Sequence, residues 1–538
     1  MKIIAAPPVY GTLHAMASSV SRRSVLRAAG VTAAGTAATF TLSGASNGAE
    51  SPVFAHGVAS GDPMPDSVLL WTRVTPSAEA VPGSGKGPSA DVRWEVAEDA
   101  GFAHVVARGH ARTGPERDHT VKVTAGGLCA STAYYYRFTS RGKVSQIGRT
   151  RTAPAHEDDV ARLRFGVVSC ANWAVGHFAP YGYLAGRDDL DAFLHLGDYL
   201  YEGNPNPAND LRPSVPPNEL ITLADYRQRH AMYKTDDHLR RLHARHPMVA
   251  TWDDHEAADN AWSGGSPSHD PATEGSWRDR MRAAHQAYFE WMPVRHRGDR
   301  LYRRLKFGKL ADLTMLDLRT YRTRQPGPSE EPDGTILGAE QRQWFLEGLA
   351  RGTASWNVIG NSVMVTPIKV PALPTREQLA LGDLLDGQPT TVNTDQWDGY
   401  TADRRRVLDA IAAQGRGNTV FLTGDVHSSW ANDVPRDGTS IAVEFVCPSV
   451  TSDNIDEQLG VPPRTGSLKV EAAIRALNPH VRFVELDSHG AGVLEVTPDA
   501  VRMSWYYVAD RRDPATAVTF AHAFRTVAGE PWVRPANG

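Results

Sequence analysis

The sequence is poor in cysteine, in net charge and in long hydrophobic runs. Its 538 residues include only three cysteines, Cys129, Cys170 and Cys447, which are too few and too scattered for a disulfide framework. Any cysteine function must therefore be individual. The formal net charge is −4, so the overall balance gives no reason to expect nucleic acid or an anionic membrane as a partner. The amino-terminal apolar stretch, residues 28–42, is too short and too polar for a stable membrane span.

The overall composition is that of a globular protein with a substantial core, because 41% of the residues are hydrophobic and 22% are charged. A chain of 538 residues predicts two to four domains, although a large α/β unit could take up much of the length. Changes of sequence texture divide the chain into a leader at residues 1–50, an all-β region at 51–153 and an α/β region at 154–538.

The leader has the order of segments that is typical of a twin-arginine export signal. Arg22 and Arg23 precede the weak apolar stretch, and small residues follow it. Met16 is a plausible alternative start to Met1. The other interpretation, a disordered basic tail, does not explain the ordered basic, apolar and small segments. We therefore expect the twin-arginine machinery as a partner and an extracellular, periplasmic or cell-wall-associated location. That pathway exports folded proteins, so a cofactor could be loaded before export.

The all-β region consists of short strands separated by turns rich in Gly and Pro. No helical period runs through it, which predicts a small β-sandwich, immunoglobulin-like in type. Nothing in this region looks catalytic, so we interpret it as a packing or spacer module. The expected strands are residues 67–74, 92–96, 120–123 and 133–138.

The region after residue 154 alternates helical stretches with compact apolar strands, which predicts an α/β core. Three long loops, at residues 204–223, 326–334 and 368–401, are expected to build the rim of a site. The expected helices are residues 276–291, 338–350 and 402–413. The expected strands are residues 163–169, 192–196, 248–252, 311–316, 356–359 and 419–423.

Each of these six strands is followed by residues that can bind a metal or a phosphate. In open α/β sheets, ligands bind outside the carboxyl ends of the strands. One such ending means little, but six together are hard to attribute to chance. In chain order the candidates are Cys170; Asp198, Tyr201 and Glu202; Asp253, Asp254, His255 and Glu256; Asp317 and Arg319; Asn361; and Asp425 with His427.

The spacing within the endings supports shared metal centres. Asp425 and His427 are two residues apart, so in an extended segment both side chains would point to one side. Asp198 and Tyr201 are three apart, which fits one turn that closes over a metal. Gly197 can provide a tight turn and a close backbone approach.

Adjacent residues in a strand ending can have different roles. The neighbours Asp254 and His255 point in different directions, so one can bind metal while the other faces substrate. Gly424 has the same expected role as the glycine at 197.

Several of these residues also have simpler interpretations. A lone cysteine after a strand, such as Cys170, is usually part of the core. Tyr201 alone could be a half-buried aromatic, and Asp253 could cap a helix that begins near residue 255. Arg319 could merely pair with Asp317. We interpret as structural His195, Cys129 and Cys447.

The donor types indicate which metals fit. A thiolate, a phenolate, a carboxylate and an imidazole suit ferric iron, whereas carboxylates and amides suit calcium or magnesium. Asp198 is placed to bridge two centres. Paired cations would activate a hydroxide and stabilise the in-line displacement of a phosphate ester. Arg319 and Asn361 are the expected phosphate contacts, and His255 could protonate the leaving alkoxide.

The chain resembles the PhoD family of alkaline phosphatases and phosphodiesterases. Several of the matching segments are distinctive, and they occur in family order over nearly the whole chain after the leader. They are residues 54–63 (FAHGVASGDP), 68–73 (VLLWTR), 169–170 (SC), 197–202 (GDYLYE), 252–256 (WDDHE), 316–319 (LDLR) and 424–430 (GDVHSSW).

The resemblance implies a fold, two cofactors and a set of roles. The fold is a metallophosphatase-type four-layer sandwich, two central β-sheets flanked by helices, preceded by the small β-sandwich. The cofactors are Fe3+ and Ca2+. Arg319 would contact phosphate and His255 would face the leaving group. The implied iron ligands are Cys170, Asp198, Tyr201 and His427, and the implied calcium ligands are Asp198, Asp254, Asn260 and Asp425.

Three functions remain open at this point. The first is an exported alkaline phosphatase that releases phosphate from phosphomonoesters, and also from diesters. The second is a phosphodiesterase with phospholipase D-like action on phospholipid headgroups. The third is a non-catalytic cell-surface binding protein, against which the complete ligand set argues. Residues 368–399 and the tail after Asp510 match nothing assignable, so the substrate is undetermined.

Overall fold

The computed structural model describes residues 52–203, 210–327, 334–369 and 393–537. The predicted export signal lies outside these ranges. Among the helices of the described residues, none is both long enough and apolar enough to cross a membrane. Residues 50–538 form one compact unit.

The largest sheet has ten strands, and its centre is a parallel group, β9, β10 and β11. It contains, from one edge to the other, β22 (Glu530–Pro535), β21 (Val518–Val527), β20 (Ala500–Val508), β19 (Gly490–Val496), β9 (Leu163–Val168), β10 (Ala192–His195), β11 (Met248–Ala250), β1 (Val58–Gly61), β2 (Ser67–Arg73) and β5 (Thr120–Gly126).

The second sheet has seven strands, of which β13, β14, β15 and β17 are parallel. In spatial order it contains β12 (Arg303–Phe307), β13 (Ala311–Met315), β14 (Trp356–Asn361), β15 (Thr419–Thr423), β17 (Thr439–Val446), β16 (Ser429–Arg436) and β18 (Val481–Glu485).

Side chains from both sheets share one buried cluster. Phe165 and Leu194 of the ten-stranded sheet belong to it together with Leu313, Val358 and Leu422 of the seven-stranded sheet. All five are fully buried. Each such side chain contributes about 1.5–3 kcal/mol by leaving water, so this cluster fixes the two sheets against each other.

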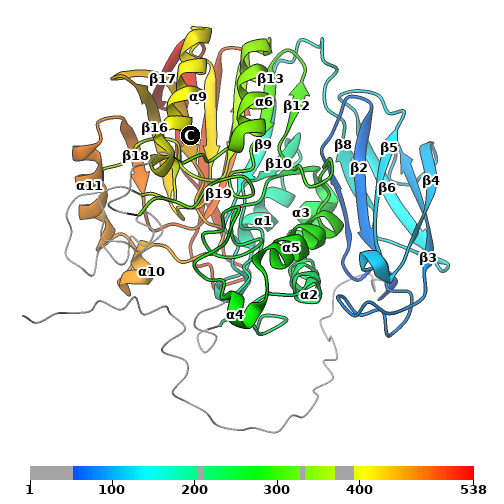
Figure 1. Ribbon diagram of the computed structural model, residues 1–538. Coiled ribbons are helices and arrows are strands. Elements are labelled where there is room, and N and C mark those ends of the chain that lie inside the picture. Colours follow the sequence, from blue (N-terminus) through cyan, green and yellow to red (C-terminus); the bar gives the residue numbers. More distant parts are fainter. Residues whose placement is uncertain (1–51, 204–209, 328–333, 370–392, 538) are drawn as a thin grey trace, which may run out of the picture. The chain divides into compact units, whose positions relative to one another are not determined.

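Helices cover the remaining sheet faces. A cluster that contains Phe193 and Tyr226 joins α1, α2, α3 and α5 to the ten-stranded sheet, and a cluster with Phe345 and Phe421 joins α6 and α9 to the seven-stranded sheet. Figure 1 shows α6 and α9 side by side. The helices are α1 (Ala179–Ala185), α2 (Leu223–Tyr233), α3 (Asp237–Arg245), α4 (Pro271–Glu274), α5 (Trp277–Trp291), α6 (Gly338–Arg351), α9 (Thr401–Gln414), α10 (Ile455–Leu459) and α11 (Ser467–Leu477).

The amino-terminal region shares a sheet with the rest of the chain, which the sequence analysis did not predict. Its strands β1, β2 and β5 continue the ten-stranded sheet through the pairing of β1 with β11. Its other strands form a five-stranded sheet that packs on them over one apolar cluster (Figure 1). That sheet contains β4 (Val105–Thr113), β3 (Ala90–Ala97), β6 (Ala133–Ser140), β7 (Lys143–Val144) and β8 (Gly148–Arg151).

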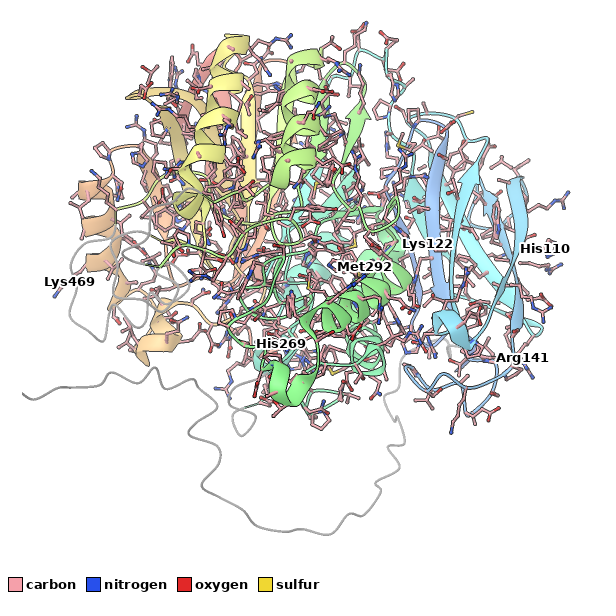
Figure 2. All side chains as sticks on the ribbon, in the orientation of Figure 1. His110, Lys122, Arg141, His269, Met292 and Lys469 are labelled. Carbon is pink, nitrogen blue, oxygen red and sulfur yellow. The ribbon has the colours of Figure 1, made fainter. Side chains whose placement is uncertain are left out.

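Polar contacts fix this region to the end of α5. Lys122 of β5, labelled in Figure 2, donates through Nζ to the carbonyl oxygens of Phe289 and Val294, at 2.6 and 3.2 Å. The indole N–H of Trp71 donates to the carbonyl of Glu290 at 2.8 Å. The carbonyls at the carboxyl end of α5 have no partner within the helix, so these bonds satisfy groups that would otherwise be buried unpaired.

All the predicted strands and helices are present, with ends that differ by a few residues. The prediction missed the carboxyl-terminal part, because it assigned no strand after residue 423, where β16 to β22 lie. The tail after Asp510, which matched nothing in sequence, forms β21 and β22 at the edge of the ten-stranded sheet.

The two sheets meet at the carboxyl ends of their parallel strands. A single parallel bridge joins Ser169, directly after β9, to Ser449, shortly after β17. The endings of β10 and β11 lie on the same side as that of β9, because the three strands are parallel neighbours. The segments that carry the candidate site residues are thereby brought together.

Asp62, in the first of the resemblance segments, has a structural function. It is fully buried, and its carboxylate accepts from Nη2 and Nε of Arg303 at 2.6 and 2.8 Å. It also accepts from the backbone N–H of Arg295. The pair joins the end of β1 to β12 of the other sheet.

We expect Asp62→Ala to lower the free energy of unfolding by about 3–5 kcal/mol, because it leaves the charge of Arg303 without its partner. Urea unfolding followed by tryptophan fluorescence measures this. The control is Asp66→Ala, which changes an exposed carboxylate in the next turn. Equal unfolding midpoints for the two variants would contradict the assignment.

Candidate active site

Three overlapping groups of potential metal ligands lie at the carboxyl ends of the strands. Within each group the ligand atoms are all within 4.8 Å of one another. Asp198 and Asp254 each belong to two groups, so the three groups form one continuous site. The groups are Cys170, Asp198 and His427; Asp198, Asp254 and His255; and Asp253, Asp254 and Asp425.

The backbone is strained at the predicted ligands. Non-glycine residues rarely have a positive φ, and such strain concentrates at functional sites. Five of the seven predicted ligands adopt it, each with φ between 49 and 65°: Cys170, Asp198, Asn260, Asp425 and His427.

The glycines before the ligands allow close packing, as predicted. Gly197 has φ 114°, and a Cβ there would lie 2.4 Å from the Cβ of Asp253. A Cβ on Gly424 would lie 2.8 Å from the Cβ of Ser169. Both positions therefore exclude any larger residue without displacement of the neighbouring turn.

The prediction that Asp425 and His427 share one centre on an extended segment is wrong. Both residues have positive φ, at 65 and 49°, so the segment bends. Asp425 joins the group that contains Asp253, whereas His427 joins the group that contains Cys170. Two left-handed residues cannot follow the side-chain alternation of a strand.

Tyr201 completes the group around Cys170. Its phenol oxygen lies 3.1 Å from Oδ2 of Asp198 and 3.2 Å from Nε2 of His427. The four residues predicted as iron ligands therefore converge on one point. The simpler interpretations, in which Cys170 is only core and Tyr201 only a half-buried aromatic, do not explain this convergence.

The electrostatics of the site favour a bound cation. Burial, followed by the charges of neighbouring carboxylates, raises the pKa of Asp198 and of Asp425 well above the ordinary value. Burial likewise raises the pKa of Cys170. Oδ1 of Asp198 is buried and accepts no hydrogen bond from the described residues. Cations would compensate these crowded acidic groups, so the residues fit metal ions.

Glu256 holds the endings of β10 and β11 together. Its Oε2 accepts from the backbone N–H groups of Asp198 and Asp253 at 3.1 and 2.8 Å, and its Oε1 accepts from that of Tyr199 at 2.7 Å. Burial raises the pKa of Glu256 to about 8. Glu256 was a candidate ligand from its place at a strand end, whereas in the structure its carboxylate accepts backbone hydrogen bonds.

Arg319 is surrounded by carboxylates. Its Nε and Nη2 donate to both oxygens of Asp253 at 2.6 and 2.9 Å, and its Nη1 and Nη2 donate to both oxygens of Asp395 at 2.8 and 3.0 Å. Nη2 is also 3.3 Å from Asp425. The interpretation that it merely pairs with Asp317 is wrong, and Asp253 is not a helix cap, because no helix begins there.

These contacts bear on the two predicted phosphate ligands. The bidentate fork of Arg319 is occupied by protein carboxylates and is almost fully buried. Asn361 is also buried; its amide N–H groups donate to Thr423 Oγ1 and the carbonyl of Val363, and its Oδ1 accepts from the Trp397 indole N–H. The structure therefore shows both residues in internal bonds, and their contact with substrate stays a prediction.

His255 is held by Glu202. Its Nδ1 is 2.7 Å from Oε2 of Glu202, and its ring lies on Tyr201 with the centroids 4.1 Å apart. Burial alone would lower the pKa of His255, but the charges of Glu202, Asp254 and Asp198 raise it well above the ordinary value.

Asn260 contributes a backbone contact. Its N–H donates to Oδ2 of Asp254 at 2.5 Å, which holds that carboxylate at the edge of the site. Its predicted role as a calcium ligand stays a prediction.

The described end of the segment expected as a loop, residues 393–401, contributes a residue that was not predicted from the sequence. Asp395 is buried and bridges two arginines, because its Oδ1 accepts from Nη2 of Arg322 at 2.6 Å as well as from Arg319. The cluster of polar and aromatic residues at 395–398, directly before α9, was the available signal.

The next two residues of the loop reach other strand endings. Gln396 donates through Nε2 to Oδ2 of Asp425 at 2.5 Å. Trp397 donates to Asn361 at the end of β14, 2.9 Å away. Three successive side chains thus brace the endings of β13, β15 and β14.

Comparison with known proteins finds related sequences and a related fold. A family model described as PhoD-like phosphatase matches residues 165–505, and one described as PhoD-like phosphatase, N-terminal domain, matches residues 38–154. The chain is 35% identical over 519 residues to alkaline phosphatase D of Bacillus subtilis (strain 168), which covers 92% of this chain and 84% of that protein. A solved structure described as "Structure of PhoD" has a TM-score of 0.79 and 32% identity, covering 92% of this chain and 94% of that chain.

We expect Asp395→Asn to reduce kcat/KM about 10–100-fold, because the neutral amide no longer fixes the guanidinium of Arg319 against the site carboxylates. The rate of phosphate ester hydrolysis measures this.

The matched control is Asp398→Asn in the same loop, whose carboxylate pairs with Arg404 instead. If the two variants hydrolyse the ester at the same rate, Asp395 does not position Arg319.

Proposed function

The chain belongs to the PhoD-like phosphatase family and is therefore a phosphoester hydrolase, and we propose that it is an exported, metal-dependent alkaline phosphatase. Its substrates are phosphomonoesters, with phosphodiesters as a second class. The observation that carries the metal dependence is the convergence of three ligand groups on strained backbone at the strand ends.

The donor chemistry supports two kinds of cation. Cys170, Asp198, Tyr201 and His427 provide the sulfur, oxygen and nitrogen donors that suit Fe3+. The oxygen-rich side, with Asp198, Asp254, Asn260 and Asp425, suits Ca2+. When bound, such cations would polarise the phosphoryl group and supply a nucleophilic hydroxide near neutral pH.

Asp253 is a further candidate on the calcium side. It belongs to the same ligand group as Asp254 and Asp425, although the ligand set implied by the family resemblance did not include it. Its two oxygens also bind Arg319, so any metal bond would be shared with that ion pair.

The chain's own residues supply proton transfer and orientation. Glu202 holds Nδ1 of His255, so Nε2 is the nitrogen that can give a proton to the leaving alkoxide. Arg319 fixes Asp253 and Asp425 at the edge of the site, and its guanidinium is the cation expected to contact the phosphate.

We also propose a specific layer architecture for the catalytic region and a specific type for the amino-terminal β-sandwich. The metallophosphatase-type four-layer sandwich is supported by the three apolar clusters that join helices, sheet, sheet and helices. The immunoglobulin-like comparison for the amino-terminal region is supported by the packing of two β layers over one core.

The test of the function compares hydrolysis of p-nitrophenyl phosphate and bis-p-nitrophenyl phosphate by the mature protein at alkaline pH with calcium. We expect turnover of the monoester. We expect Asp198→Asn to lower the rate of this hydrolysis more than about 100-fold, because loss of a direct metal ligand is more damaging than loss of a residue that contacts a ligand.

A clear preference for the diester would instead indicate a phosphodiesterase, and phospholipids would be tested next.

The control for the Asp198 variant is Asp188→Asn, which changes an exposed side chain. Unchanged hydrolysis by the Asp198 variant would contradict the metal-dependent mechanism.

Export rests on the leader sequence. Replacing the pair, Arg22→Lys with Arg23→Lys, should keep the phosphatase inside the producing cell, because the paired guanidinium groups define the signal. Enzyme activity in the cell and exported fractions measures this, with Arg27→Lys as control. Export at the unchanged level by the double variant would show that another route is used.

A further inference from the structure

A seventh strand ending lies against the cluster around Cys170. The segment at residues 449–454 follows β17 and runs beside the turn after β9. The N–H of Val450 donates to the carbonyl of Ser169 at 3.0 Å, and the N–H of Ser452 donates to that of Cys170 at 3.2 Å. The segment is thus fixed, through backbone bonds, to the residue that provides the thiolate.

Ser452 reaches the phenol oxygen of Tyr201. Its Oγ lies 2.6 Å from that oxygen and 3.0 Å from the carbonyl oxygen of Cys170. A serine hydroxyl has one proton, so it can donate to only one of them. The carbonyl of Cys170 already accepts from two backbone N–H groups, those of Thr451 and Ser452. The shorter contact, to Tyr201, is therefore the bond that needs the proton.

Asp453 acts on the next ligand through its backbone. Its carbonyl oxygen is 3.0 Å from Nδ1 of His427. A carbonyl can only accept, so Nδ1 carries the proton and Nε2 presents its lone pair, 3.2 Å from the phenol oxygen of Tyr201. Outer contacts of this kind orient imidazole ligands and tune them.

A buried hydrogen-bond array holds the segment in place. Ser449 Oγ is 2.8 Å from Nδ1 of His489, whose Nε2 is 2.9 Å from Oε1 of Glu457. Arg511 pairs with the Asp453 carboxylate at 2.6 Å. The array has the residue types of a Ser–His–Glu triad, but Ser449 is fully buried and lies 2.8 Å from the carbonyl oxygen of Ser452. It is therefore a frame for the segment and not a nucleophile.

We propose that Ser452 is a positioning residue whose hydroxyl donates a hydrogen bond to the phenolate of Tyr201 and thereby sets the donor strength of this ligand. The role of Asp453 toward His427 is complementary. The proposal rests on the ferric site of the proposed function.

The physical consequence is spectroscopic. A hydrogen bond to the phenolate stabilises its lone pairs, so more energy is needed to move an electron from the ligand to ferric iron. Without the Ser452 proton, the visible charge-transfer band moves to longer wavelength. Turnover falls about 10–100-fold, as is usual when an outer contact of a metal ligand is lost.

The experiment compares visible spectra and turnover of the purified, exported holoenzyme with those of its variants. Ser452→Ala should move the band to longer wavelength, and Ser452→Cys, with its weaker S–H donor, should give a smaller move. Ser452→Thr retains the hydroxyl and should restore the native band. The control Arg512→Ala changes an exposed side chain beside this array, so its band should not move.

The outcomes distinguish a failure of the role of Ser452 from a failure of the ferric site itself. A native band that Tyr201→Phe abolishes, but that neither Ser452→Ala nor Ser452→Cys moves, overturns the role of Ser452 and leaves the ferric site intact. A colourless, fully active native enzyme overturns the ferric–phenolate site and the role of Ser452 with it. Should the alanine variant fail to fold, the cysteine variant decides the question.

Discussion

The need to hold several acidic side chains together in a buried space governs this structure. Asp198, Asp253 and Asp254, which are buried, lie with the half-buried Asp425 and a thiol at one edge of two sheets, where their charges repel one another. Such an arrangement is unfavourable unless cations compensate it. The protein supplies part of the compensation through Arg319, and the remainder is what bound metal ions would contribute. The strained backbone at five predicted ligands indicates that the surrounding fold enforces this arrangement.

The rest of the fold follows from that requirement. Parallel strands deliver side chains from distant parts of the chain to one edge, and the bridge between Ser169 and Ser449 joins the two sheets at that edge. Glu256 holds two strand endings by accepting backbone bonds, and the loop with Asp395 braces three others. The amino-terminal strands extend the ten-stranded sheet and are joined across to the seven-stranded sheet by the ion pair between Asp62 and Arg303. Each device adds rigidity around groups that repel one another.

The sequence predicted the strand endings because apolar runs and the residues that follow them are local features. It could not reveal Asp395 or Ser452, since these reach the site from segments whose approach depends on the three-dimensional path of the chain. The extended geometry expected for Asp425 and His427 was wrong because both adopt positive φ, a conformation that Asp and His tolerate better than most residues but that the sequence does not assign to a particular position. The strands after residue 423 were missed because their sequences mix apolar with polar or charged residues, as in β16 (Ser429–Arg436) and β21 (Val518–Val527), and so lack the compact apolar runs on which the prediction relied. Arg319 was recognised as important, but its carboxylate partners became apparent only in the fold.

Anomalous diffraction from crystals of the exported enzyme, measured on both sides of the iron absorption edge, tests the central claim most directly. We expect an iron peak among the Cys170 thiolate, the Asp198 carboxylate, the Tyr201 phenolate and Nε2 of His427, with a lighter cation toward Asp254 and Asp425. Active enzyme whose crystals show no metal among these residues, or a metal bound only elsewhere, would contradict it.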